Sequence, residues 1–325
     1  MGRFRIIIIL LVLALILVWP FFGPEYQVYL TLSFFAYSVA LLGLNLLFNY
    51  TGLLSFGHAL FVGIGGYTAA FLSSKFHILS MELSIVLAIV ISGIVAALIG
   101  LICVRYIKIY FAMLTLAFGM LFHSFLMKTY YLTGGDEGMP VERLHLLGID
   151  FSSMDQMKFF CGPYYYYSLG VLIIATIVMW RIVHSHFGLC LMSIRDNPDK
   201  AKYLGIEIRK YRLYAFIIAG CFGGIGGVLL APVTGHMDPG IVFWTHSGDL
   251  VFMTLVGGFT NFFGPMLGSV IFIYLKDVVS SFMEYWRFVF GALLAIVVIM
   301  APGGIVELIS RSFGLLLGKT GSGDT

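Results

Sequence analysis

Long apolar stretches with few or no charged side chains recur along the whole chain and constrain its fold more than any other feature. A helix that crosses a bilayer needs about 20 mostly apolar residues, and such stretches cover residues 6–19, 26–48, 53–73, 83–104, 109–128, 164–183, 213–231, 248–260, 264–282 and 288–301. Only 11% of the 325 residues are charged and 60% are hydrophobic, whereas a water-exposed surface needs about a quarter of its residues charged. The sequence therefore predicts an all-α, polytopic transmembrane helical bundle of about ten spans and excludes a soluble domain.

The positions of lysine and arginine predict the orientation of these spans, because cytoplasmic connections carry an excess of basic residues. With both termini in the cytoplasm, thirteen of the nineteen lysines and arginines lie on the inner face, and eleven of the sixteen acidic residues lie on the outer face. The first stretch is followed by the bulky residues Trp19 and Pro20, so we expect an uncleaved span and not a removed signal peptide. Residues 1–325 then form one transmembrane domain with two long connections, an external one at 129–163 and a cytoplasmic one at 184–212.

The ten predicted spans divide into two halves of five. Because five is an odd number, the second half enters the membrane in the opposite sense to the first. In each half the third stretch is interrupted by glycines, at 53–73 and at 248–260. Glycine-broken segments at corresponding places are typical of transporters with inverted repeats, so the pattern is consistent with an inverted 5+5 repeat.

The cytoplasmic connection contains DNPDKAKYLGIEIRK, which has the start and stop signals of a short helix. Asp196 or Asn197 can cap this helix, and Pro198 suits its first turn. Gly205 can end it in a left-handed conformation. A helix of about two turns is not stable alone in water, so we expect it to dock into another protein. The alternative is a solvated loop whose basic residues merely follow the positive-inside rule.

The stretch NYTGLLSFGHALFVGIGGYTAAF, from Asn49 to Phe71, combines glycines with polar side chains inside a predicted span. Glycine allows a backbone to unwind, which lipid permits only where the segment is shielded by protein or lines water. We therefore expect this stretch to line a translocation path, with the candidate residues Ser55, Gly57, His58, Gly63, Gly65, Gly66, Tyr67 and Thr68. In the alternative interpretation the glycines serve packing, and a neighbouring carbonyl group satisfies the His58 imidazole.

Further glycines recur at intervals of four residues in AGCFGGIGGVLLAP, as the pairs Gly220/Gly224 and Gly223/Gly227. Small residues one turn apart let two helix backbones approach closely in lipid. The pairs therefore favour close helix packing in the predicted span 213–231.

Several absences narrow the range of possible mechanisms. No aspartate or glutamate lies in the middle of a predicted span, so the usual carboxylate of a proton- or sodium-coupled carrier is missing. The tail segment GLLLGKT has the wrong glycine spacing for a phosphate-binding loop, so we expect no nucleotide hydrolysis, no catalytic residues and no cofactor bound by this chain. His184 and His186 lack acidic or cysteine partners nearby, so no metal site is expected.

Several long segments, in order, resemble a known family. They are GLNLLFNYTGLLSFGHALFVGIGGYTAA, LTLAFGMLFHSFLMKTYYLTGGDEGM, SIRDNPDKAKYLGI, YRLYAFIIAGCFGGIGGVLLAP, LVGGFTNFFGPMLGSV and APGGIVELI. The chain is similar to the permease subunits of ABC importers for branched-chain amino acids, of the LivM type, from about Asn45 to Leu308.

This resemblance implies a transport subunit that moves branched-chain or other neutral amino acids inward by alternating access. It implies a bacterial or archaeal plasma (inner) membrane and no nucleic-acid partner. The implied partners are a second homologous permease subunit in a heterodimer, two cytoplasmic ABC ATPase subunits that use ATP and Mg, and a periplasmic or extracellular amino-acid-binding protein.

The resemblance also implies two contact sites. The first is a coupling helix that contacts the ATPase, formed by Asn197, Pro198, Ala201, Tyr203, Leu204 and Gly205. The second is an external turn near the binding protein, formed by Thr133, Gly134, Gly135, Asp136 and Glu137. Glu137 departs from the family, which more often has aspartate there.

Three other functions stay open at this point. Relatives with nearly the same pattern carry urea or short amides. A passive small-solute channel can also be built from glycine-rich segments, although a channel has no need of a capped cytoplasmic helix. A secondary carrier would be driven by a proton or sodium gradient alone.

Overall fold

A computed structural model of the chain describes residues 15–282, 288–292 and 295. Its α-helices are α2 (Glu25–Asn45), α3 (His58–Ser74), α4 (Met81–Cys103), α5 (Ile109–Lys128), α6 (Tyr130–Thr133), α7 (Gln156–Phe159), α8 (Tyr165–Val183), α9 (His186–Asp196), α10 (Pro198–Tyr203), α11 (Ile208–Thr234), α12 (Trp244–Gly257) and α13 (Gly264–Phe282). Short helical turns are η1 (Leu46–Thr51), η2 (Gly135–Glu137), η3 (Phe160–Tyr164) and η4 (Pro239–Val242). The strands β1 (Met139–Pro140) and β2 (His236–Met237) pair antiparallel. The predicted all-α helical class is confirmed.

Five helical segments are long and apolar enough to cross a membrane within the described part of the chain. They are Glu25–Thr51, Met81–Cys103, Ile109–Lys128, Gln156–Val183 and Ile208–Thr234. The chain is therefore an α-helical membrane protein with several spans.

The number of ten spans stays a prediction. Three other predicted spans coincide with α3, α12 and α13, which have 17, 14 and 19 residues. The last of these carries Lys276 and Asp277. The predicted spans 6–19 and 288–301 lie mostly outside the described residues.

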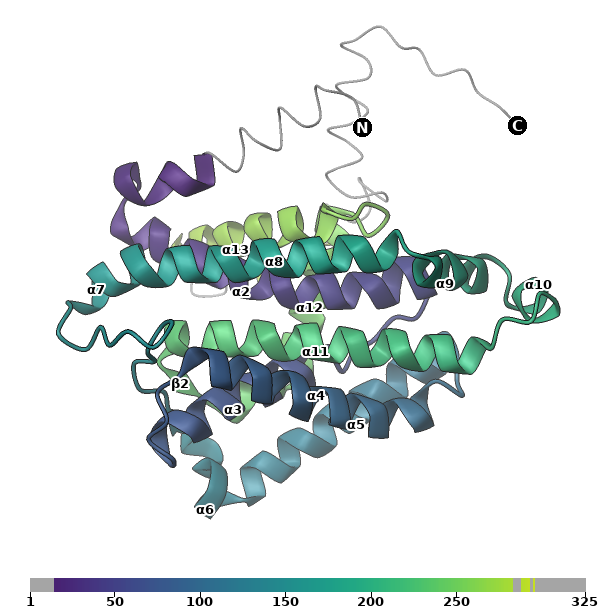
Figure 1. The fold of residues 1–325 in the computed structure, drawn as a ribbon, viewed down its shortest axis with the longest axis horizontal. Helices are drawn as coiled ribbons and strands as arrows, with labels where there is room; N and C mark the ends of the chain where they lie inside the picture. Colours follow the sequence, from purple (N-terminus) through teal and green to yellow (C-terminus); the bar gives the residue numbers. More distant parts are fainter. Residues whose placement is uncertain (1–14, 283–287, 293–294, 296–325) are drawn as a thin grey trace, which may run out of the picture.

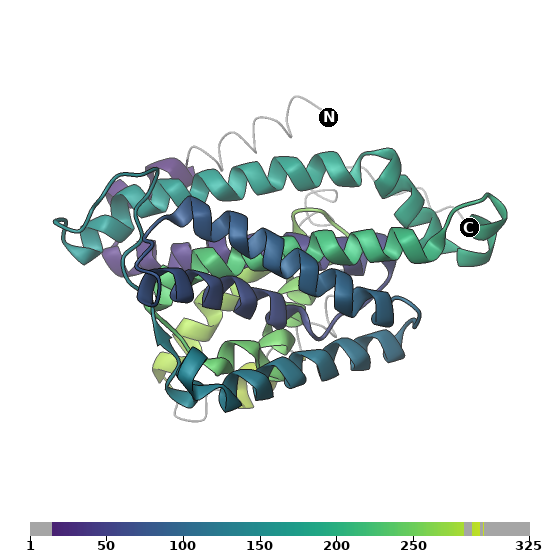
Figure 2. The same ribbon diagram turned by 60° about the horizontal axis from the view of Figure 1, so that its bottom comes forward.

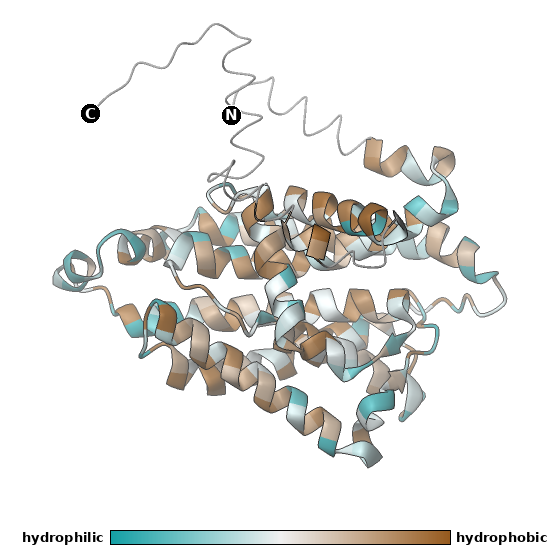
Figure 3. Ribbon diagram, turned by 180° about the vertical axis from the view of Figure 1, so that it is seen from behind, coloured by the Kyte–Doolittle hydropathy of each residue, from teal (hydrophilic) through white to brown (hydrophobic). Residues whose placement is uncertain are grey.

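The helix α11 lies at the centre of the bundle and packs against α2, α3 and α4. In both ribbon views it runs through the middle of the molecule, while α5 lies at the edge (Figure 1 and Figure 2). Hydrophobic residues also run along outward-facing helices, whereas hydrophilic segments gather toward the ends of the bundle (Figure 3). Exposed apolar side chains on α4 include Val90, Ile94, Leu98 and Leu101, as expected for a surface that faces lipid or another subunit.

Glycine brings the central helices into contact. A Cβ atom at Gly65 would lie 1.9 Å from the carbonyl oxygen of Gly224, and one at Gly227 would lie 1.9 Å from the carbonyl oxygen of Val62. On the other side of α11, a Cβ atom at Gly226 would lie 2.7 Å from the carbonyl oxygen of Ala36 in α2. The backbones of α2, α3 and α11 could not approach this closely with larger residues. The close packing predicted from the glycine pairs of α11 is confirmed.

The expected break in the stretch 53–73 lies at its beginning. Helix α3 runs without interruption from His58 to Ser74, and the irregular backbone lies before it, at residues 52–57. Gly52 there adopts the left-handed conformation, with φ of 69°. The expectation that Gly63, Gly65 and Gly66 unwind the helix was wrong. These glycines stay helical and leave room for atoms of η4, α11 and β2 to pack closely against α3.

The two long connections lie at opposite ends of the bundle (Figure 1). At one end the connection 129–163 is bonded to two other connections: Val141 donates its N–H to the carbonyl of Gly235 at 3.0 Å, and Met81 donates to the carbonyl of His145 at 3.1 Å. At the other end, α9 and α10 extend beyond the rest of the bundle.

Replacing Gly65 with alanine tests the close contact between α3 and α11. The added methyl group would overlap the backbone of α11, and overpacking of this kind costs about 1–3 kcal/mol. We expect Gly65→Ala to lower the melting temperature of the detergent-solubilised protein. Gly170→Ala in α8 is the matched control, because no atom lies within 4 Å of the added Cβ. Equal melting temperatures for the two variants would contradict the account.

Candidate functional site

The short helix predicted in the connection 184–212 is present as α10, with both of its end signals. The side chain of Asn197 accepts a hydrogen bond from the N–H of Lys200 at 3.0 Å, and Pro198 occupies the first turn. At the other end, the N–H of Ile206 donates to the carbonyl of Ala201 and the N–H of Gly205 donates to that of Lys202. This pair of bonds is the Schellman motif, which needs a left-handed residue, and Gly205 supplies it with φ of 82°.

The last residues of α10 present apolar side chains to the outside. Tyr203 is 90% exposed and Leu204 is 79% exposed, whereas Ala201 is buried. Two large, exposed apolar groups at the tip of a well-capped helix form a surface suited to docking. The contact with an ATPase itself stays a prediction.

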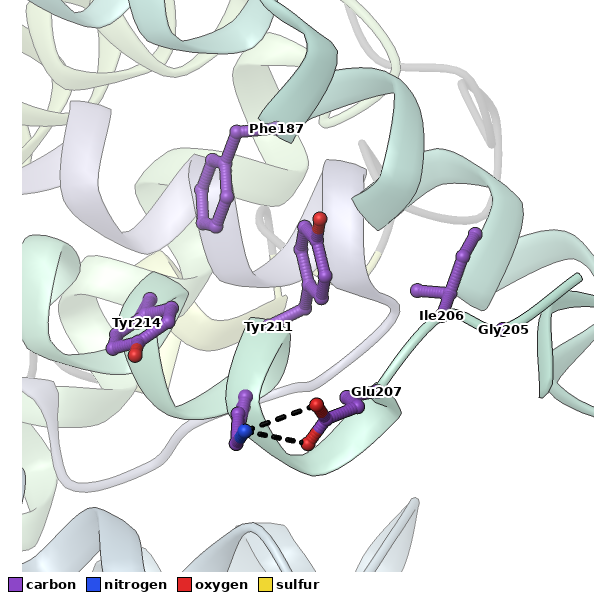
Figure 4. Close-up of a pocket in the computed structure, with 7 residues that line it drawn as sticks. Phe187, Gly205, Ile206, Glu207, Tyr211 and Tyr214 are labelled. Carbon is purple, nitrogen blue, oxygen red and sulfur yellow. Dashed lines mark hydrogen bonds and ion pairs between the residues drawn. The ribbon is translucent and has the colours of Figure 1, made fainter.

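A groove lies beside α10, between α9 and the first turns of α11 (Figure 4). Its volume is about 380 Å³, and its lining residues are Phe187, Gly205, Ile206, Glu207, Lys210, Tyr211 and Tyr214. The rings of Phe187 and Tyr211 stack with centroids 5.6 Å apart, and the ammonium group of Lys210 lies 2.8 Å from a carboxylate oxygen of Glu207. Sequence reasoning missed this groove, although Glu207 and Lys210 have the spacing of a helical ion pair.

The candidate path residues of α3 are buried in the bundle. Nε2 of His58 lies 3.1 Å from the carbonyl oxygen of Ala40, with which it can form a hydrogen bond. A Cβ atom at Gly57 would lie 2.1 Å from the carbonyl oxygen of Thr115 in α5. All eight candidates, Ser55, Gly57, His58, Gly63, Gly65, Gly66, Tyr67 and Thr68, are buried, and none lines the groove of Figure 4.

The turn predicted to lie outside, at residues 133–138, has the conformation that its glycines allow. Gly134, Gly135 and Gly138 all have positive φ, at 74°, 56° and 72°. The hydroxyl of Thr133 donates to the carbonyl of Leu126 at 2.7 Å and anchors the turn to α5, while Asp136 and Glu137 are exposed. The turn continues into β1, and so into the pairing with β2.

Arg143 orders the rest of the connection 129–163. Its Nη1 donates to the carbonyls of Phe151 at 2.9 Å and Met154 at 2.6 Å, and its guanidinium carbon lies 5.2 Å from the centre of the Phe159 ring. Sequence reasoning missed this residue, because no local signal shows which backbone segment an arginine will meet.

The carboxylate of Asp150 in the same connection is stabilised in its charged form. It accepts hydrogen bonds from the backbone N–H of Ser152 at 2.8 Å and from the hydroxyl of Ser152 at 3.0 Å. These bonds, together with the nearby side chains of His145 and Arg143, lower the pKa of Asp150. The connection therefore keeps a fixed negative charge near neutral pH.

Replacing Gly138 with alanine tests the attachment of the external turn. A Cβ atom there would lie 2.3 Å from the carbonyl oxygen of Met237. We expect Gly138→Ala to separate β1 from β2 and to speed trypsin cleavage after Lys128 or Arg143 from the outside. Gly148→Ala is the control: Gly148 also has positive φ, of 75°, but no atom lies within 4 Å of the added Cβ. Cleavage at the same rate in both variants would show that β1–β2 does not hold the turn.

Comparison with known proteins identifies the family. The model of the family described as "Branched-chain amino acid transport system / permease component" matches residues 26–298. The high-affinity branched-chain amino acid transport system permease protein LivM of Salmonella typhimurium is 25% identical over 94% of this chain and 76% of its own length. LivM of Escherichia coli K12 is 26% identical over 93% of this chain and 74% of its own length.

A relative that matches a shorter part of the chain is named for a different substrate. The nucleoside ABC transporter permease protein NupC of Lactococcus lactis is 28% identical over 36% of this chain and 41% of its own length. No solved structure matches the chain. The family match covers most of the residues that the structure describes. The chain belongs to the permease components of branched-chain amino acid ABC importers, and it is a non-catalytic transport subunit.

Proposed function

We propose that the chain forms the LivM-type half of an importer that moves branched-chain amino acids into the cell by alternating access. Its partners are a second permease subunit, two ATPase subunits that use ATP and Mg, and an external amino-acid-binding protein. The observation that carries the proposal is the family match over residues 26–298, together with a capped helix whose apolar tip is exposed at one end of the bundle.

We propose ten spans in two inverted halves of five, with both termini in the cytoplasm of a bacterial or archaeal cell. Connections assigned to the same side of the membrane contact each other, which supports this topology. On the proposed outer side, His145 donates its N–H to the carbonyl of Leu79. On the proposed inner side, Arg195 donates to Asn49 at 2.6 Å, and Asn49 donates to Thr260 at 3.4 Å.

The two ends of the bundle then have different partners. We propose that α10, within the cytoplasmic connection 184–212, contacts an ATPase through Tyr203 and Leu204. We propose that the turn of Asp136 and Glu137, within the external connection 129–163, contacts the binding protein; its exposed acidic groups and its place at the opposite end support this.

The polar stretch from Ser55 to Thr68 has a structural role in the proposed path. His58 bonds to α2 and Gly57 abuts α5, so both residues are held between neighbouring helices. We propose that Ser55 to Thr68 holds the wall of the path in shape.

Competition for leucine uptake tests the proposed substrate. Cells that carry all subunits take up labelled leucine in the presence of excess isoleucine, valine, urea or a nucleoside. We expect isoleucine and valine to compete and the other two to have no effect. The nucleoside is included because the chain is similar to NupC. Competition by urea or by the nucleoside would show that the proposed substrate class is wrong. A chain that conducts leucine in liposomes without ATPase subunits would be a channel.

Replacing Tyr203 with alanine tests the proposed ATPase contact. A buried tyrosine at an interface centre contributes about 2 kcal/mol or more, so we expect Tyr203→Ala to retain clearly less ATPase in co-purification and to slow uptake. Tyr131→Ala is the control, because Tyr131 is 93% exposed, against 90% for Tyr203, and lies at the opposite end. If both variants retain the wild-type amount of ATPase, α10 is not the contact.

A further inference from the structure

One side chain joins the α9–α10 unit to the cytoplasmic end of α2. Arg195 lies in the last turn of α9, and α10 begins three residues later at Pro198. Its Nη1 donates to the backbone carbonyl of Asn49 at 2.6 Å and lies 3.4 Å from the side-chain oxygen of the same residue. Its Nε and Nη2 both bond a carboxylate oxygen of Asp196 at 2.9 Å. The guanidinium group is therefore held on two sides.

The backbone around Asn49 departs from the α-helix where the arginine meets it. Helix α2 continues into the π-helical turn η1, and Gly52 then turns the chain in a left-handed conformation. A Cβ atom at Gly52 would lie 3.1 Å from Cγ of Arg195, so the turn passes directly against the arginine stem. Single π turns are frequent at functional sites in helices, and the segment 52–57 that follows is irregular up to α3.

Asn49 also reaches the connection between α12 and α13. It is 8% exposed, and its Nδ2 donates to the backbone carbonyl of Thr260 at 3.4 Å. One turn earlier in α2, Nδ2 of Asn45 donates to the carbonyl of Phe262 at 3.4 Å. The connection itself begins at Gly258, whose φ of 100° ends α12. The buried amide of Asn49 thus contacts the connection 258–263 and the arginine that precedes α10. The stem of that arginine lies against Gly52, where the connection 52–57 begins.

We propose that Arg195 is a positioning residue that carries the displacement of α10 to Asn49, and through Asn49 to the connections that follow α2 and α12. The proposal rests on the proposed function, in which ATP-driven movement enters at α10. A rigid, two-sided guanidinium contact transmits displacement better than a single flexible ammonium bond would. The two connections that it reaches have the irregular backbone that a hinge requires.

The test separates transport from ATP hydrolysis in the complete importer, reconstituted in liposomes with all subunits and the binding protein. We expect Arg195→Gln to leave ATP hydrolysis nearly unchanged and to lower leucine uptake per ATP by about tenfold, within the range for mutations that modulate coupling. The matched control is Arg209→Gln, which removes an exposed positive charge from the first turn of α11 and should leave the ratio unchanged.

Two further variants distinguish transmission from a merely structural role. We expect Asn49→Ala to lower uptake per ATP as well, and the double variant to be no worse than the more affected single one, because both residues act through one contact. We expect Arg195→Lys, which can keep one bond to the Asn49 carbonyl, to give an intermediate ratio. Should Arg195→Gln fail to accumulate in the membrane, Asn49→Ala and Arg195→Lys carry the test.

Other outcomes overturn the inference. If hydrolysis and uptake fall in parallel, or the losses of the two single variants add, Arg195 does not transmit movement. An unchanged ratio in Arg195→Gln has the same consequence. Co-purification of the ATPase with each variant keeps this result separate from the proposed ATPase contact: that contact fails when Tyr203→Ala retains the ATPase, whatever the ratio measured for Arg195→Gln.

Discussion

The close approach of α11 to α2 and α3 is the contact on which the rest of the structure depends. In lipid there is no hydrophobic force that presses one apolar helix against another, so association relies on van der Waals contact between backbones. Gly227 of α11 faces the carbonyl of Val62 in α3, and Gly226 faces the carbonyl of Ala36 in α2, at separations that leave no room for a Cβ atom. These glycines fix three helices into one unit. Inside this unit, Nε2 of His58 lies within hydrogen-bond distance of the carbonyl oxygen of Ala40, and the hydroxyl of Thr68 donates to the carbonyl of Ile64.

The irregular backbone of the chain lies at the ends of this packed unit. At the proposed outer end, left-handed glycines and the β1–β2 pair hold a turn that presents acidic groups. At the proposed inner end, η1 and Gly52 lie against Arg195 in the last turn of α9, and Asn49 of η1 donates to Thr260 in the connection 258–263. In the proposed importer, this non-catalytic subunit receives its driving force from the ATPase subunits. A rigid centre with deformable ends suits the transmission of such a movement, because a displacement at one end is then passed through the packed helices without being absorbed by them.

The sequence predicted those features whose signals are local. The cap, the first-turn proline and the terminal glycine of α10 lie within nine residues, from Asn197 to Gly205, and each has one structural meaning. The glycine pairs of α11 likewise predicted close packing, because two glycines four residues apart lie on the same face of a helix. The helical membrane class followed from apolar length, and the family from several segments in order.

Features that depend on distant partners could not be predicted. From its glycine content, the break in the stretch 53–73 was expected too far along the sequence. Only the three-dimensional contacts show that Gly63, Gly65 and Gly66 serve close packing against other elements. The contacts of Arg143 and Arg195 were not predicted either. The latter meets a residue 146 positions away, and an arginine after a predicted span looks, from sequence, like any other residue that follows the positive-inside rule.

Hydrogen–deuterium exchange on the assembled importer, with and without ATP, tests most directly whether a rigid centre joins two deformable ends. The account predicts that amide exchange at residues 52–57 and 258–263 changes together when ATP binds, while the amides of α3 and α11 that face each other stay equally protected. A change spread along α11, or a change in one of the two connections without the other, would contradict it.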